Sequence, residues 1–111
     1  MFEKDLHLGF LLDFYGVLLS DRKRTVMDMY YNEDFSLSEI AEQIEISRQG
    51  VRDIIKKSED ELMFYEEKLG LAKKMQAVEE QTTKLHELSK STSLPEEIHD
   101  QINVLAELIR Q

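Results

Sequence analysis

The sequence contains no cysteine and only one proline among its 111 residues. The absence of cysteine excludes disulfides, thiolate metal sites and a cysteine nucleophile, and it fits a reducing compartment. The N-terminus has no basic region followed by an apolar run and a small-residue cleavage site, so we expect no secretory signal. These absences favour a cytoplasmic protein.

Long hydrophobic runs are also missing. The longest apolar-rich stretch, Leu6 to Leu19, is interrupted by Asp13 and is too short to cross a bilayer. We therefore expect no insertion into a membrane.

Catalytic and cofactor motifs are absent as well. His7, His86 and His99 are scattered, and none has a second histidine or a cysteine at metal-ligand spacing. The four glycines form neither a phosphate-binding loop nor a dinucleotide-binding pattern. The sequence predicts no enzyme, no metal site and no cofactor.

Positive charge is scarce, since the formal net charge is -9. Residues 1–35 carry 4 basic and 7 acidic side chains, residues 36–58 carry 4 and 4, and residues 59–111 carry 6 and 12. Because phosphate contacts supply most non-specific affinity for nucleic acid, a neutral segment in an acidic chain predicts weak, salt-sensitive binding.

That neutral segment, Ser36 to Lys57, has the spacing of two short helices joined by a tight turn. Ser36 and Glu39 form a capping box, so a helix begins near Leu37, and Ser47 can cap a second helix. The residues expected to point inward are apolar: Ile40, Ala41, Ile44, Val51, Ile54 and Ile55. This pattern predicts a helix-turn-helix motif.

The opposite face of the second helix carries long hydrogen-bond donors. In a helix-turn-helix, the second helix lies in the major groove and its N-terminal side chains meet base edges. We therefore predict contacts to nucleic acid from Ser47, Arg48, Gln49, Arg52 and Lys56.

Two further helices are predicted ahead of the motif. Residues 6–19 are apolar around most of the helix, which indicates either the centre of a bundle or part of a self-association surface. Ser20 and Asp21 are suited to begin the next helix, which ends near Asn32. Its first turn carries Arg22, Lys23 and Arg24, which either contact phosphates or simply form a solvated turn.

The second half of the chain consists of helical seams. From Val51 a heptad seam runs to Leu69, so the recognition helix extends to about Leu69, and Gly70 is either its end or a kink in a longer helix. Another helix follows, and Ser93, Pro95 and Glu96 mark a fresh start for the last one. We predict a homodimer whose self-association surface includes Leu62, Tyr65, Leu69, Ile98, Ile102, Leu105 and Ile109.

No segment shows the alternation of a strand, so the fold class is all-α. We expect a helix-turn-helix unit over residues 1–70, followed by long helices in a C-terminal extension over residues 71–111. That extension would pack on the first unit or on a partner chain.

Two resemblances support this interpretation. The stretch from Leu18 to Lys57 is similar to region 4 of bacterial sigma factors, the helix-turn-helix that reads the promoter -35 element. The likeness lies in LSDRKR at residues 19–24, SLSEIA at 36–41 and ISRQGVR at 46–52, although Glu45 stands in the turn where glycine is common. It implies that Ser47, Arg48, Gln49, Arg52 and Lys56 face nucleic acid, while Val51 and Ile55 hold the helices together.

A nearly full-length resemblance is to the YlxM-like family (UPF0122 type) of small bacterial proteins. It rests on LGFLLDFYGVLLSDRKR, YYNEDFSLSEIAEQ, ISRQGVRDIIKKSE and YEEKLGL. Members are described as helix-turn-helix regulators and are tied to the signal recognition particle pathway because their genes neighbour the gene of its GTPase. The resemblance implies a regulator that binds DNA or the particle's RNA; the alternative is a protein-interaction module that binds a component of the particle without contacting nucleic acid.

Overall fold

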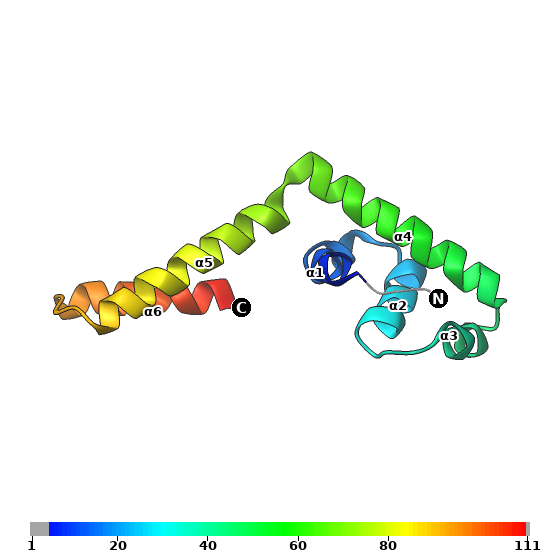
Figure 1. Cartoon of the computed structure of the whole chain (residues 1–111), viewed down its shortest axis with the longest axis horizontal. Coiled ribbons are helices and arrows are strands. Elements are labelled where there is room, and N and C mark those ends of the chain that lie inside the picture. Colours follow the sequence, from blue (N-terminus) through cyan, green and yellow to red (C-terminus); the bar gives the residue numbers. More distant parts are fainter. Residues whose placement is uncertain (1–4, 111) are drawn as a thin grey trace. The chain divides into compact units, whose positions relative to one another are not determined.

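A computed structural model of the chain describes residues 5–110, and these residues contain helices and no strand. The all-α prediction is confirmed. In chain order the elements are α1 (Leu6–Tyr15), the 3-10 helix η1 (Gly16–Leu18), α2 (Asp21–Tyr31), α3 (Leu37–Ile44), α4 (Arg48–Leu69), α5 (Leu71–Lys90) and α6 (Glu96–Arg110) (Figure 1). The described residues form two compact units, which divide between Ala72 and Lys73.

Serine side chains begin three of the helices, as the sequence predicts. The hydroxyl of Ser20 accepts from the backbone N–H of Lys23, and that of Ser47 accepts from the N–H of Gly50. Ser36 and Glu39 form the reciprocal capping box, in which each side chain accepts from the other residue's backbone N–H. These bonds satisfy donors that a helix start otherwise leaves unpaired, so the boundaries follow from local chemistry.

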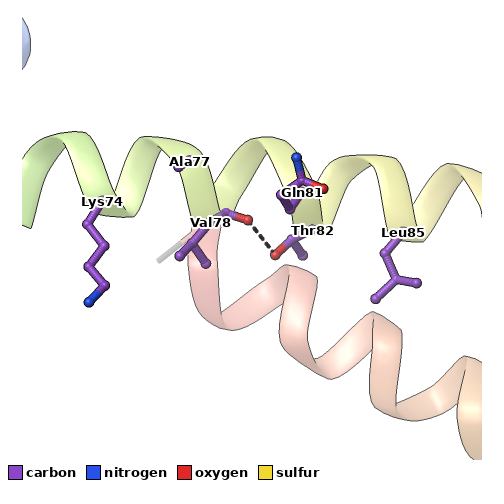
Figure 2. Close-up of a pocket in the computed structure, with 6 residues that line it drawn as sticks. All are labelled: Lys74, Ala77, Val78, Gln81, Thr82 and Leu85. Carbon is purple, nitrogen blue, oxygen red and sulfur yellow. Dashed lines mark hydrogen bonds between the residues drawn. The ribbon is translucent and has the colours of Figure 1, made fainter.

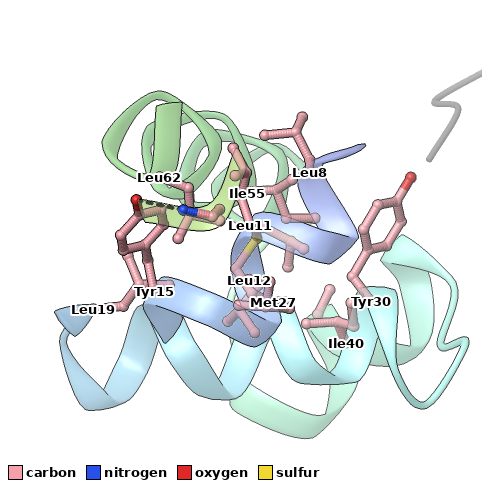
Figure 3. Close-up of a cluster of buried hydrophobic side chains, with 14 residues drawn as sticks. Leu8, Leu11, Leu12, Tyr15, Leu19, Met27, Tyr30, Ile40, Ile55 and Leu62 are labelled. Atoms are coloured by element: carbon pink, nitrogen blue, oxygen red, sulfur yellow. Dashed lines mark hydrogen bonds between the residues drawn. The ribbon is translucent and has the colours of Figure 1, made fainter. Parts of the chain in front are cut away.

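The core of the first unit lies between α4 and the three helices that precede it, each of which packs against α4. The side chains that fill this core are apolar and come from all four helices. They include Leu8, Leu11, Leu12, Tyr15, Val26, Met27, Tyr30, Ile40, Ala41, Val51, Ile55 and Leu62 (Figure 3). Helix α4 is therefore both the second helix of the motif and the support of the whole unit.

Most of α1 is buried or half-buried. Leu8, Leu11 and Leu12 face the core, whereas Leu6 is 92% exposed and Val17, in η1, is 69% exposed. Phe10 and Phe14 are partly buried against the same core, and Leu19 is buried in it, so α1 is a core helix, one of the two alternatives that the sequence left open. Val17 is exposed because α1 ends at Tyr15 and the chain continues in a tighter 3-10 turn, which changes the direction in which the side chains point.

The heptad seam of α4 is divided between core and surface. Leu62 is fully buried in the core of its own unit, Tyr65 is half-buried, and Leu69 is 53% exposed. Leu62 is therefore not available to a second chain, and we correct its assignment to the self-association surface. The heptad spacing of apolar residues in α4 reflects its packing against α1, α2 and α3 of its own chain along most of its length.

Gly70 ends α4. Its backbone is left-handed, with φ of 61°, and its N–H donates to the carbonyl of Glu66 at 2.8 Å before α5 begins at Leu71. Glycine adopts this conformation without steric cost, so Gly70 is a helix-terminating residue and not a kink within one continuous helix. The first turn of α5 belongs to the first unit, since Ala72 is fully buried there.

In the second unit, α6 runs back along α5 after the turn at residues 91–95. Nε2 of His86 lies 3.0 Å from Oδ1 of Asn103, while Glu79, further back on α5, lines a small cavity with Arg110 at the end of α6. The two helices therefore form an antiparallel hairpin. Its buried side chains are Thr82, Ser89, Ile102 and Ala106.

Candidate nucleic-acid interface

The turn between α3 and α4 has the tight geometry of a helix-turn-helix. Glu45 caps α3 in the left-handed conformation, with φ of 58° and ψ of 45°, and its N–H donates to the carbonyl of Ala41. The N–H of Ile46 donates to the same carbonyl at 3.1 Å, and Ser47 then begins α4. The reversal takes place within three residues, so the N-terminus of α4 projects immediately beside α3.

The predicted contact residues share the solvent side of α4. Arg48, Arg52 and Lys56 follow one another at intervals of four residues, which places them on one stripe of the helix. These three side chains, together with Ser47 and Gln49, are exposed, while the neighbouring apolar positions of α4 are buried. The structure brings all five predicted residues to one accessible surface, which we call the α4 stripe; their role in binding stays a prediction.

Carboxylates lie within the α4 stripe and reduce its positive charge. Nζ of Lys56 lies 3.1 Å from Oδ1 of Asp60, and the side-chain amide of Gln49 donates to Oδ1 of Asp53 at 3.0 Å. Both pairs are exposed, so their contribution to stability is small. Sequence reasoning did not single out Asp53 and Asp60, although the interval of four residues on a helix is a visible signal.

Lys23 of the basic cluster on α2 contacts α4 beyond the C-terminal end of the α4 stripe. Nζ of Lys23 lies 2.8 Å from Oε1 of Glu61, which is five residues along α4 from Lys56 and thirteen from Arg48, or about 8 Å and about 20 Å at 1.5 Å per residue. The bond from Lys23 is the main cause that lowers the pKa of Glu61. Lys23 therefore holds α2 to α4, whereas Arg22 and Arg24 remain exposed on the first turn.

Tyrosine hydroxyls bind carboxylates on α4, a feature that sequence reasoning missed. Tyr31 donates to Glu59, and Tyr65 donates to Glu61 at 2.9 Å. Burial is the largest cause that raises the pKa of Tyr31, and the bond to Glu59 adds to it. Both phenols stay protonated at neutral pH and act as structural donors. The bond from Tyr31 spans 28 residues, so no local pattern could have signalled it.

Within residues 5–110, no three histidine or acidic side chains gather closely enough to hold a metal ion. No helix in that range is long and apolar enough to cross a membrane.

A turn of three residues, two capped helices and an exposed basic stripe on the second helix define a helix-turn-helix protein. Comparison with known families agrees: a model described as "Putative helix-turn-helix protein, YlxM / p13 like" (UPF0122) matches residues 2–107. The chain belongs to this family.

Relatives match over most of their length. UPF0122 protein YlxM of Bacillus subtilis is 46% identical over 106 residues, which cover 96% of both chains. UPF0122 protein lmo1802 of Listeria monocytogenes is 43% identical over 95% of this chain and 96% of its own. UPF0122 protein TTE1463 of Caldanaerobacter subterraneus is 52% identical over 82 residues, or 74% of this chain and 70% of its own. The predicted family is confirmed, and its description is that of a helix-turn-helix protein, not of an enzyme.

Proposed function

We propose that the protein binds nucleic acid through the α4 stripe and acts as a regulator in the cytoplasm. The observation that supports this most directly is the exposure of Arg48, Arg52 and Lys56 along one side of α4, with Arg48 at its first position. The start of a recognition helix is where side chains reach base edges, and arginine pairs with guanine by two hydrogen bonds.

The binding should be weak and sensitive to salt. Asp53 and Asp60 lie beside the donors of the stripe, and the chain as a whole carries a net charge of -9. Each phosphate contact releases counterions, so a stripe with few cations gives modest affinity that falls as salt rises. DNA and structured RNA both present these phosphates, so both are candidate ligands of the α4 stripe.

The family resemblance favours a role in the signal recognition particle pathway. We propose that the nucleic acid is either DNA or the particle's RNA. The second candidate is a protein-interaction module that uses the same scaffold to bind a protein component of the particle. The observation that favours it is the number of half-exposed aliphatic side chains on α5 and α6, since apolar surface of this kind marks interaction sites.

We also propose that the chain forms a homodimer and that the second unit carries most of the interface. Of the predicted self-association residues, Ile98 and Leu105 on α6 are about half-exposed, and Ile109 is partly exposed. Ile102 is buried within its own hairpin, so, like Leu62, it is removed from the predicted surface. A dimer would carry two recognition helices, and binding through both at once raises the effective affinity of two weak sites.

The test is a titration of the full chain against the particle's RNA, random duplex DNA and the particle's GTPase, each at two salt concentrations. The double variant Arg48→Ala with Arg52→Ala should weaken binding to nucleic acid by about tenfold or more, because each arginine contact contributes roughly 1–3 kcal/mol. A matched control, Lys84→Ala with Arg110→Ala, removes the same charge from exposed positions on α5 and α6.

The control variant should bind nearly as well as the wild type. If both double variants weaken binding equally, general electrostatics and not the α4 stripe is responsible. Binding to the GTPase alone, unaffected by the loss of Arg48 and Arg52, would reject the nucleic-acid function in favour of the protein-interaction module.

A further inference from the structure

The hairpin of α5 and α6 has a band of half-exposed aliphatic side chains. The band runs along two shallow grooves, one on α5 lined by Val78 and Leu85 and one on α6 lined by Ile98 and Leu105. These four side chains are 40% to 46% exposed, and Leu108 is 62% exposed. We call this set the apolar face of the hairpin.

The four groove residues lie on the same side of the hairpin. Val78 and Leu85 stand four residues before and three residues after Thr82, which is buried between the helices. Ile98 and Leu105 stand at the same intervals from Ile102, which is also buried. In an antiparallel helix pair, equal offsets from the seam fall on the same face of the pair, because reversing the second helix also reverses its direction of rotation. Figure 2 shows Val78 and Leu85 projecting along one side of α5.

The other side of the hairpin is polar. Glu79 and His86 occupy the opposite flank of Thr82, and they line a cavity together with Arg110. His86 also bonds to Asn103 across the two helices. The hairpin therefore has one apolar and one polar face, as a layer in a larger helical bundle does.

The buried seam is too small to stabilise the hairpin alone. Two of its buried side chains, Thr82 and Ser89, are polar, and their hydroxyls bond to the backbone of α5 itself. The larger aliphatic side chains lie outside the seam. Helical units below about 40 residues usually need a partner to supply enough apolar burial. The apolar face is the surface on which that partner would supply it.

Charge points to the partner. Lys74 lines the α5 groove at the open end of the hairpin, and Glu97 lines the α6 groove next to the turn. A two-fold axis perpendicular to the helices places the open end of one hairpin on the turn end of the other. The positively charged Lys74 of each copy then lies at the same end of the bundle as the negatively charged Glu97 of the other copy, so the surface is complementary to itself in both apolar character and charge.

We propose that the apolar face binds the same face of a second copy, forming an antiparallel four-helix bundle from two α5–α6 hairpins. This inference rests on the proposed homodimer and specifies its surface and its orientation. An apolar centre with a polar rim is the arrangement found in protein–protein interfaces. Partner proteins and the first unit of the same chain are the competing occupants.

Sedimentation equilibrium of the full chain tests the proposal. The wild type should have twice the mass of one chain at micromolar concentration, and Leu85→Glu or Leu105→Glu should shift it to the monomer mass. The matched control Thr83→Glu adds the same charge on the polar side of α5 and should leave the dimer intact. Because the second copy supplies part of the burial that stabilises the hairpin, circular dichroism of Leu85→Glu and Leu105→Glu should show less helix than the wild type, whereas Thr83→Glu should retain the wild-type helix content.

The charge pairing needs its own variants. Lys74→Glu alone should weaken the dimer by at least severalfold at low salt, and Lys74→Glu combined with Glu97→Lys should restore it. A wild type that is monomeric overturns both the homodimer and this face. A wild-type dimer that survives Leu85→Glu and Leu105→Glu retains the homodimer and overturns the face, and failure of the charge reversal to restore binding overturns the antiparallel orientation.

Discussion

The hydroxyl of Tyr15 donates to Oε1 of Glu66 at 2.7 Å, joining residues 51 positions apart. The hydroxyl oxygen of Tyr15 also accepts from the backbone N–H of Leu71 at 3.1 Å and from that of Ala72 at 3.3 Å. Oε1 of Glu66 accepts from the N–H of Ala72 as well, at 3.1 Å. Donors at the start of a helix have no partner within it, and here they bind a side chain of α1 and one of α4. Tyr15 therefore fixes the point at which α5 leaves the first unit.

Tyr15→Phe should lower the free energy of unfolding by about 1–3 kcal/mol, because it removes one charged hydrogen bond and leaves buried donors with fewer partners. Urea unfolding followed by circular dichroism measures the change. The comparison variant is Tyr65→Phe, which removes a single bond to the part-exposed Glu61 and should cost about 1 kcal/mol or less. Equal losses in the two variants would contradict the role assigned to Tyr15.

The tyrosines should ionise at a higher pH in the folded protein than in the unfolded chain. All four tyrosines of the chain have a raised pKa: burial is the main cause for Tyr15, Tyr30 and Tyr31, and the bond to Glu61 is the main cause for Tyr65. Because the folded pKa exceeds the unfolded value of about 10, the stabilisation is fully present below pH 10 and is lost as pH rises above it.

Absorbance of tyrosinate near 295 nm measures this titration. The folded protein should show little ionisation at a pH where the urea-unfolded chain is already half ionised, and stability should fall steadily above that pH. Coincident titration curves for folded and unfolded protein would contradict both the burial of the phenols and their bonds to the carboxylates of α4.

Glu45→Gly should stabilise the protein by about 0.5–1 kcal/mol. Glu45 adopts the left-handed conformation at φ of 58°, which costs an ordinary residue roughly 1–2 kcal/mol and glycine almost nothing, while glycine loses more entropy on folding. Glu45→Ala is the control, because it removes the same charge but keeps the Cβ atom. Thermal or urea unfolding should show a gain for glycine only; a similar gain in both variants would assign the effect to charge.

Local chemistry in the sequence was sufficient for the starts of α2, α3 and α4 and for the accessible side of the motif. Ser36 with Glu39 and Ser47 cap helices whose donors lie within three residues, so the bonds do not depend on the rest of the fold. Apolar periodicity likewise placed Arg48 and Arg52 on the solvent side, because the inward side of a helix is determined by the spacing of its apolar residues.

Tertiary structure alone decided what each periodic surface contacts. The heptad seam of α4 was compatible with a second chain, but α1, α2 and α3 bury it as far as Leu62, because the spacing of apolar residues does not specify which helix covers them. Lys23 and Tyr15 are joined to carboxylates 38 and 51 residues away, and such pairs form only once packing has brought the helices together. Contacts between residues a few positions apart can therefore be predicted from the sequence, whereas the surface that packs against a helical face depends on the whole fold.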